Sequence, residues 1–341
     1  SATTEYSCTV KNNVTSVTVN ATATSTKAKV RGLGAKDLVE GKNTLPIRVI
    51  AEDGSEKIYN INITRKAGAS SLKNEIMKNS VITANPTLTT SSNNTNDESG
   101  LYVSNATNTG EPTYYFRGNV ENNYVSFAGQ TWRIVRVNED GTIRIIMQDG
   151  INNNATYKFN SNVNLYTYMY YTNSEAKTTL ENWYQTNIGS KSDLAKNVAS
   201  GAYYCEQAKA KYGDNYTSGN AVMTTYNKYT PDFKCSSDGN GKGVVNASVG
   251  LLTYDEVVYA GGYYNRNNSN YYLNNPAIAW WTMSLAGIAS GYLFVWNVNT
   301  SGLIGVYNVS YTRRLRPVLI LNADTKISDG DGSKDSPFVV E

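Results

Sequence analysis

Alternation of apolar and polar residues in three short segments is the feature that most limits how the N-terminal part of this chain can fold. The segments are residues 14–19, 44–50 and 57–63. Successive side chains of a strand point to opposite faces, so this period indicates strands with one buried face. Glu-Asp-Gly-Ser at 52–55 supplies a hairpin turn between the last two segments. Residues 1–66 are therefore predicted to form a small all-β sandwich.

This first segment resembles the cadherin-like, or Ig-like, β-sandwich modules of bacterial surface proteins. The resemblance is carried by residues 13–23, by Leu38 followed by Gly-Lys-Asn-Thr at 41–44, and by Ala-Glu-Asp-Gly at 51–54 with Tyr59. It implies a stalk or spacer module that contributes no catalytic or binding residues.

Small residues at 66–71 predict a linker and place a domain boundary there. Residues 67–111 are expected to comprise this linker, a short helix at 72–78 and a loop over 83–111 that is rich in Thr, Ser and Asn. Residues 112–341 are then predicted to be the second domain.

The second domain begins with strand patterns and contains helical patterns further along. Strands are predicted at 114–118, 124–127, 131–137 and 142–146, and Asn-Glu-Asp-Gly at 138–141 supplies the turn between the last two. Helices are predicted at 175–184 and 252–260. In the second helix, Thr253 and Glu256 have the spacing of a capping box.

Residues 112–341 resemble the C-type-lectin-fold domains of surface proteins from gut Firmicutes. The resemblance is carried by 124–127 with 132–136, by 249–262, by 280–284 and by 315–319. Formylglycine-generating enzymes and the variable proteins of diversity-generating retroelements share this fold. The resemblance implies an α+β domain whose C-terminal strands and loops present a ligand-binding face. In the retroelement-diversified members, adenine-directed mutagenesis rewrites exposed codons near the C-terminus.

The composition of the C-terminal segment fits such mutagenesis. Between residues 284 and 325 there is no Lys, Glu, Gln, Met or His. Randomised adenines in Asn codons that end in a pyrimidine cannot yield Lys, Glu, Gln, Met or Trp. Trp296 is the exception, which favours a scaffold role or an unusual template codon. The alternative is that a β-rich, partly buried end is depleted of Lys and Glu for structural reasons alone.

Scaffold residues and candidate binding residues alternate in this segment. The scaffold residues are Val295, Val298, Gly302, Val309, Leu315, Arg316, Pro317 and Val318. The candidate ligand-binding residues are Ala286, Ile288, Ala289, Ser290, Tyr292, Leu293, Phe294, Trp296, Tyr307, Asn308, Ser310, Tyr311, Arg313 and Arg314. Tyr, Trp and Arg carry most of the energy of protein interfaces. An alternative for Phe294 and Trp296, two residues apart on one strand face, is that both belong to the core.

The Cys and His content limits the chemistry of the chain. Three Cys and no His exclude Ser-His-Asp, Cys-His and His-zinc sites. The catalytic cysteines of formylglycine-generating enzymes have no counterpart, so no enzymatic activity, cofactor or metal is expected. A disulfide between Cys205 and Cys235 is predicted to stabilise the fold by roughly 3 to 4 kcal/mol in an oxidising exterior; the alternative is two reduced, buried thiols. Cys8 is expected to be unpaired and buried on its strand.

The predicted function is that of an extracellular, cell-surface receptor or adhesin with a C-terminal face diversified by a retroelement. Its partner is expected to be a protein or glycan ligand on another cell, a phage or a host surface. The net charge of +3 is spread along the chain, so nucleic acid is not an expected partner. No apolar run is long enough to span a membrane, and attachment is expected only through an anchor outside residues 1–341. The alternative is a non-diversified adhesin, or a pilus or surface structural protein of the same fold.

Overall fold

The computed structural model describes residues 3–86, 88, 98–163, 170–206, 231–235, 244–264, 266–289 and 291–341. The chain is mostly β and divides into two compact units. The first unit comprises Ser1–Ser70 with Ile327–Asp329, and the second comprises Ser71–Lys326 with Gly330–Glu341.

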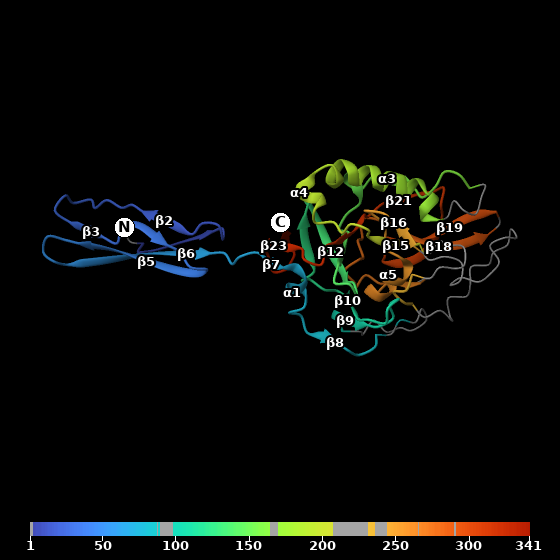
Figure 1. Ribbon diagram of the computed structural model, residues 1–341, viewed down its shortest axis with the longest axis horizontal. Helices are drawn as coiled ribbons and strands as arrows, with labels where there is room; N and C mark the ends of the chain where they lie inside the picture. The colour runs from blue at the N-terminus through green and yellow to red at the C-terminus, as the bar shows by residue number, and fades with distance from the viewer. Residues whose placement is uncertain are drawn as a thin grey trace. The chain divides into compact units, whose positions relative to one another are not determined.

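The first unit is a β-sandwich, drawn in blue in Figure 1. Its strands are β1 (Glu5–Val10), β2 (Ser16–Val19), β3 (Lys29–Arg31), β4 (Gly34–Asp37), β5 (Gly41–Ile50) and β6 (Glu56–Arg65). One sheet has the order β1-β6-β5-β3, and β2 pairs with β4 in the other. Val19, Leu38, Ile47 and Ile63 form the buried core. The predicted sandwich and the β5–β6 hairpin are thus confirmed.

The free cysteine of the first unit differs from its prediction. Cys8 is unpaired, as expected, but it is exposed rather than buried. It lies on β1, the last strand of its sheet, where the side chains of residues 5–9 are all exposed. A strand that is exposed on both faces buries neither set of its alternating side chains, so the expectation that Cys8 is buried is wrong.

The strands that follow along the chain have these bounds. They are β7 (Ser70–Ser71), β8 (Val81–Ile82), β9 (Gly100–Ser104), β10 (Thr113–Arg117), β11 (Tyr124–Phe127), β12 (Gln130–Val137), β13 (Ile143–Met147), β14 (Thr156–Lys158), β15 (Tyr203–Cys205), β16 (Val244–Asn246), β17 (Tyr263–Tyr264), β18 (Trp280–Ala289), β19 (Tyr292–Val298), β20 (Leu303–Asn308), β21 (Thr312–Arg314), β22 (Val318–Leu321), β23 (Lys326–Asp329) and β24 (Phe338–Val340).

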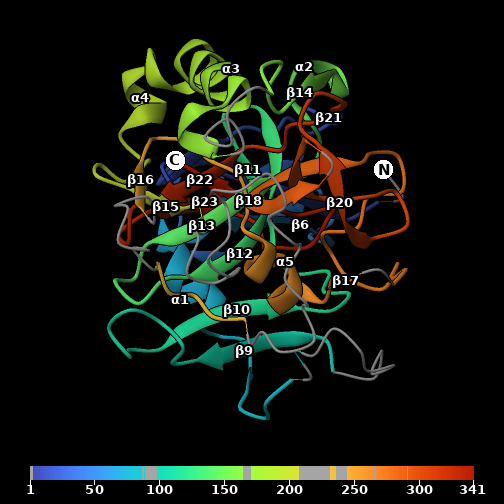
Figure 2. The same ribbon diagram turned by 90° about the vertical axis from the view of Figure 1, so that its right-hand side faces the viewer.

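The helical elements are short. They are α1 (Leu72–Ile76), α2 (Ile151–Asn154), η2 (Tyr171–Asn173), α3 (Glu175–Tyr184), η3 (Gln185–Gly189), α4 (Ser192–Ala195) and α5 (Tyr254–Ala260). In α5 the Thr253 side chain accepts from the Glu256 N–H, and the Glu256 side chain accepts from the Thr253 N–H, which confirms the predicted capping box. Figure 2 shows α3 and α4 on one side of the second unit, with β9 and β10 on the opposite side.

One sheet of the second unit is organised around the buried strand β12. The strand order includes β24-β11-β12-β10-β9-β8, and β13 pairs with β12 and with β22. Trp132 and Ile134 on β12, with Ile145 on β13, are fully buried. The Asp140 carboxylate accepts the Thr142 N–H at 2.9 Å in the predicted turn between β12 and β13. These strands and this turn are therefore confirmed, whereas β9 occupies part of the predicted loop 83–111 because β10 pairs with it.

A second sheet of this unit has the order β14-β21-β18-β19-β20-β17. It carries the C-terminal segment in which the sequence places the binding residues. β15 and β16 pair separately, next to the disulfide.

Candidate ligand-binding face

The candidate site lies on the second sheet, where β19 pairs in antiparallel fashion with β18 and β20. Val295 lies directly opposite Tyr307, and Phe294 lies opposite Asn308. Directly opposed side chains point to the same face of a sheet, and neighbours along a strand point to opposite faces. Tyr307 and Phe294 therefore lie on opposite faces, so the candidate residues do not form one continuous surface.

Part of the candidate set is core rather than surface. Leu293 is 2% exposed and Trp296 is 0% exposed. The Trp296 ring packs 4.8 Å from the Tyr254 ring of α5 and 5.4 Å from the Tyr264 ring of β17. Trp296 is thus buried by elements distant in sequence, which matches the alternative interpretation of this residue.

Two further candidates, Ala286 and Asn308, are buried. Ala286 is buried on β18. The Asn308 carboxamide oxygen accepts the N–H and the hydroxyl of Ser310 at 2.9 and 2.8 Å, which closes the turn after β20. Ser290 and the side chains of Ile288 and Ala289 lie outside the described residues.

The remaining candidates reach solvent. Tyr292 and Tyr311 are 56% and 57% exposed. Partly exposed candidates are Phe294, Tyr307, Ser310, Arg313 and Arg314. The scaffold residues are all buried, as predicted: Val295, Val298, Gly302, Val309, Leu315, Arg316, Pro317 and Val318.

Three of these residues, Tyr307, Tyr311 and Arg313, lie together with Tyr157 of β14, and we call these four residues the Tyr–Arg cluster. The Arg313 guanidinium carbon lies 3.4 Å from the centre of the Tyr307 ring, and the Tyr307 and Tyr311 ring centres are 5.3 Å apart. Tyr157 on β14 lies opposite Arg313 in the β14–β21 register. A cation over an exposed aromatic ring contributes about 0.5 to 1 kcal/mol, so this stacking holds the Arg313 side chain on the sheet.

The Tyr–Arg cluster rests on buried aromatic side chains. The Trp281 ring lies 5.9 Å from the Tyr307 ring and 5.7 Å from the Phe159 ring. The Trp281 indole N–H donates to the Tyr157 carbonyl at 3.0 Å. Because Trp281 is fully buried, the exposed rings are supported by core packing.

The electrostatics of this sheet are one-sided. None of its six strands β14, β17, β18, β19, β20 and β21 contains Asp or Glu, whereas β14 carries Lys158 and β21 carries Arg313 and Arg314. Within the described part of the chain, neither Arg313 nor Arg314 forms an ion pair with a carboxylate. The sheet thus presents aromatic rings, uncharged polar groups and positive charge.

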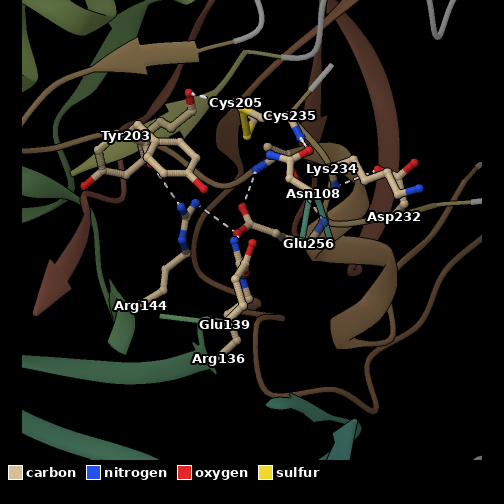
Figure 3. Close-up of a disulfide and its surroundings, with 12 residues drawn as sticks. Asn108, Arg136, Glu139, Arg144, Tyr203, Cys205, Asp232, Lys234, Cys235 and Glu256 are labelled. Atoms are coloured by element: carbon tan, nitrogen blue, oxygen red, sulfur yellow. Dashed lines mark hydrogen bonds and ion pairs between the residues drawn. A yellow bond between two sulfur atoms is a disulfide. The ribbon is translucent and has the colours of Figure 1, made fainter. Parts of the chain in front are cut away.

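A second polar region lies beside the disulfide and was not anticipated from the sequence. Arg136 and Arg144 converge on the carboxylate of Glu256, with N–O distances of 3.3 and 2.9 Å, and all three side chains are buried (Figure 3). Glu139 adds a weaker contact to Arg136 at 3.7 Å. We call these four residues the Arg–Glu network.

The Arg–Glu network governs the charge state of Glu256. Burial by itself raises the pKa of the Glu256 carboxyl, but the attraction of Arg144 and Arg136 outweighs burial, and the net pKa lies below its usual value. Burial and the repulsion of Arg144 lower the pKa of Arg136. The Glu256 carboxylate therefore stays ionised at neutral pH, and its ion pairs connect β12 and β13 to the first turn of α5.

The predicted disulfide is confirmed, because Cys205 on β15 is bonded to Cys235. A cavity of about 100 Å³ lies nearby, lined in part by Arg136, Arg144 and Tyr203. Phe233, near Cys235, packs on the Tyr259 ring at 4.0 Å. The bond thus anchors residues 231–235 beside the Arg–Glu network, where the centre of the Phe233 ring lies 4.9 Å from the Arg136 guanidinium carbon.

Groups of metal ligands and membrane-spanning helices are both absent from the described residues. In the described ranges, no three His, Cys, Asp or Glu residues gather in a way that could hold a metal ion. The helices of those same ranges are all too short or too polar to cross a bilayer.

Comparisons with known proteins identify the first unit alone. Residues 1–66 match the model of the cadherin-like beta sandwich domain family, which confirms the predicted N-terminal module. No curated protein and no solved structure matches the chain. The cadherin-like module and the disulfide are compatible with an extracellular protein.

Proposed function

We propose that this chain is a cell-surface ligand-binding protein, a receptor or adhesin, that binds through the Tyr–Arg cluster. In this proposal the cadherin-like module is a spacer, and residues 112–341 form a C-type-lectin-fold domain anchored to the cell outside residues 1–341. The observation that carries the proposal is the cluster itself: exposed Tyr311, with Tyr307 and Arg313 stacked beside it, on a sheet without acidic residues. Tyr and Arg are enriched among the residues that dominate binding energy.

The proposal extends to retroelement diversification of the exposed codons of the C-terminal strands. Tyr292, Tyr307, Tyr311 and Arg313 reach solvent without being part of the core, so they tolerate replacement. Surface substitutions away from special features usually change stability by no more than about 0.5 kcal/mol. Replacing a buried Trp such as Trp296 costs about 3 to 5 kcal/mol, so a diversified gene must leave such codons unchanged.

The second candidate function is that of a fixed adhesin or surface structural protein of the same fold. The burial of Leu293, Trp296 and Asn308 favours it, because these residues interrupt the series of exposed positions. In this case the missing residue types between 284 and 325 reflect strand composition alone.

Sequencing the 3′ end of the gene across many cells of its source population separates the two functions. Diversification predicts variation at the codons of Tyr292, Tyr307, Tyr311 and Arg313, with Leu293 and Trp296 constant. An invariant 3′ end without a nearby template repeat refutes diversification and leaves the fixed adhesin.

Ligand binding itself is tested with cells from the same habitat. The purified chain is compared with a variant carrying Tyr307→Ser and Tyr311→Ser, and binding is measured by flow cytometry. Tyr6→Ser is the matched control, since Tyr6 is an exposed tyrosine of the cadherin-like module. Loss of binding by the double variant alone supports the proposal; equal binding by all three proteins refutes a binding role for the Tyr–Arg cluster.

A further inference from the structure

We infer that the Tyr–Arg cluster binds an acidic patch on another protein, and that the neighbouring turn at Asn152–Asn154 is a fixed part of the same site. The inference rests on the proposed function, because it specifies the partner of the face described above. It adds a chemical class for the ligand and a positioning element that lies more than 120 residues before the C-terminal segment.

The turn before β14 has an unusual backbone. Asn152, Asn153 and Asn154 all have positive φ angles, of 51°, 57° and 63°. Asn is among the few non-Gly residues that adopt this left-handed region, and consecutive residues of this kind are rare. Such conformations persist where surrounding contacts hold them, and they cluster at ligand-binding sites.

The contacts of this turn are directed at the Tyr–Arg cluster. The Asn152 side-chain amide donates to the Tyr157 hydroxyl at 2.8 Å, and the Asn154 carbonyl accepts from Arg314 Nε at 3.2 Å. Tyr157 and Arg314 lie on the paired strands β14 and β21, next to Arg313. The turn therefore positions the edge of the sheet that carries the exposed cation and rings.

The charge of the face selects an anionic partner. Arg313 lies flat on Tyr307, donates from Nε to the Asn297 carboxamide at 3.4 Å and from one terminal nitrogen to the Thr312 carbonyl at 3.1 Å. An Arg guanidinium that already stacks on an aromatic ring presents its remaining N–H groups in the plane that suits a carboxylate. Lys158 extends the positive charge along β14, which carries no acid to oppose it.

The composition of the face favours a protein over other anions. Exposed or partly exposed side chains around the cluster are Tyr, Asn, Thr, Ser and Arg, together with Lys158. Of these types, Tyr, Asn, Ser and Arg are enriched in the antibody paratopes that contact proteins. Tyrosines offer rigid contact area, while short amides and hydroxyls supply adaptable hydrogen bonds. Acidic polysaccharides carry the same negative charge but are not the partners for which such paratope-like side chains are typical. An acidic polysaccharide therefore serves as the competing probe.

The test uses two probes against the full chain: a displayed library of random peptides and the acidic polysaccharide polygalacturonate. The inference predicts that selected peptides are enriched in Asp and Glu relative to the input library. Their affinity is expected to fall about tenfold in Arg313→Gln, the factor that corresponds to about 1.4 kcal/mol. Arg31→Gln, which removes an exposed charge of the first unit, is the matched control and should leave affinity unchanged.

The contribution of the turn is measured separately with Asn152→Gly. This change keeps the left-handed backbone accessible and removes the amide that orients Tyr157. Affinity for the selected peptides should fall roughly threefold to tenfold, the range for one neutral hydrogen bond, while the thermal midpoint of unfolding stays unchanged. Unchanged affinity in Asn152→Gly excludes the turn from the site.

The other outcomes distinguish this inference from the proposed function. Peptides that bind the cluster without acidic enrichment overturn the anionic partner but leave a ligand-binding face. Polygalacturonate that binds through Arg313 where peptides do not overturns the protein partner. If neither probe binds, the inference is wrong, while the cell-binding comparison of the Tyr307 and Tyr311 variant still decides the proposed function.

Discussion

Replacing Glu256 by Gln tests whether the Arg–Glu network stabilises the second unit. Glu256 is buried, accepts from Arg144 at 2.9 Å and from Arg136 at 3.3 Å through one oxygen, and accepts the Thr253 N–H at 2.9 Å through the other. Gln preserves the shape and one acceptor oxygen, and it is tolerated at this position of a capping box. The substitution therefore removes the charge with little change in packing.

The expected loss of unfolding free energy is about 3 kcal/mol. Removing one partner of a buried ion pair costs about 3 to 5 kcal/mol, because the opposite charge is left without compensation. Here two buried guanidiniums lose their shared carboxylate, while Glu139 stays near Arg136 at 3.7 Å. We therefore take the lower end of that range, which corresponds to a change of more than about a hundredfold in the folding equilibrium.

Denaturant unfolding followed by Trp fluorescence measures this loss in the right unit. Every Trp of the chain belongs to the second unit, at Trp132, Trp183, Trp280, Trp281 and Trp296. The signal is therefore independent of the cadherin-like module. Glu181→Gln is the control, because Glu181 forms a partly exposed pair with Lys177 one turn earlier in α3, and i,i+4 pairs on helices contribute about 0.3 to 0.5 kcal/mol.

A Glu256→Gln variant no less stable than Glu181→Gln would refute the reasoning. A second measurement isolates the electrostatic part, since Arg144→Met should cost less in the Glu256→Gln background than in the wild type. In that background the Arg144 charge is no longer compensated, so its removal relieves repulsion with Arg136. Strictly additive losses would show that packing, and not charge, explains the effect.

Two further predictions concern the stability of the second unit. Burial raises the pKa of several tyrosines in the folded state, among them Tyr171, Tyr204, Tyr254, Tyr271 and Tyr272. The stability that these buried tyrosines contribute is complete below pH 10. It is lost as the pH rises, by about 1.4 kcal/mol per pH unit for each tyrosine, because the tyrosines of the unfolded chain ionise first. A spectrophotometric titration should show these tyrosines ionising only as Trp fluorescence reports unfolding, and ionisation in the native state near pH 10 contradicts this. Replacing Cys205 and Cys235 together by Ser should lower the unfolding free energy by about 3 to 4 kcal/mol, measured by denaturant unfolding, and an unchanged midpoint contradicts it.

Local patterns were sufficient to predict elements whose signals lie within a few residues. Hairpin turns such as Asp140-Gly141, the capping box of Thr253 and Glu256, and the strand alternation of β5 and β6 depend on neighbouring residues. Each specifies its own backbone conformation through hydrogen bonds or side-chain direction. The structure therefore reproduces these elements with small changes at their ends.

Elements that depend on distant partners could not be predicted in this way. Strand β14 is three residues long and forms because Thr156 lies opposite Arg314, far along the chain. The left-handed turn at Asn152–Asn154 is stabilised by Tyr157 and Arg314 and has no distinctive pattern beyond the run of Asn. The sequence interpretation consequently missed the edge of the candidate site that these segments form.

The same limitation explains why the candidate binding residues divide into surface and core. Alternation along β19 correctly separates two faces, but it does not say which face meets another element. Tyr254 of α5 and Tyr264 of β17 cover Trp296, whereas Tyr307 on the other face remains partly open beside Arg313. A single apolar-to-polar period cannot distinguish these outcomes, because both faces of β19 carry buried apolar side chains, Leu293 and Val295 on one face and Trp296 on the other.

This division has a physical consequence for the proposed diversification of the exposed residues. Tyr307 packs on Trp281, which is fully buried and tied to the β14 backbone through its indole N–H, and Tyr311 packs against Tyr307. Replacing an exposed ring above such a support removes contact area without opening a cavity, so the fold persists while the binding chemistry changes. A cation at Arg313, oriented by a ring that is itself replaceable, changes its direction with each substitution at Tyr307. Diversity of binding is thus compatible with one stable scaffold only where the support beneath is invariant.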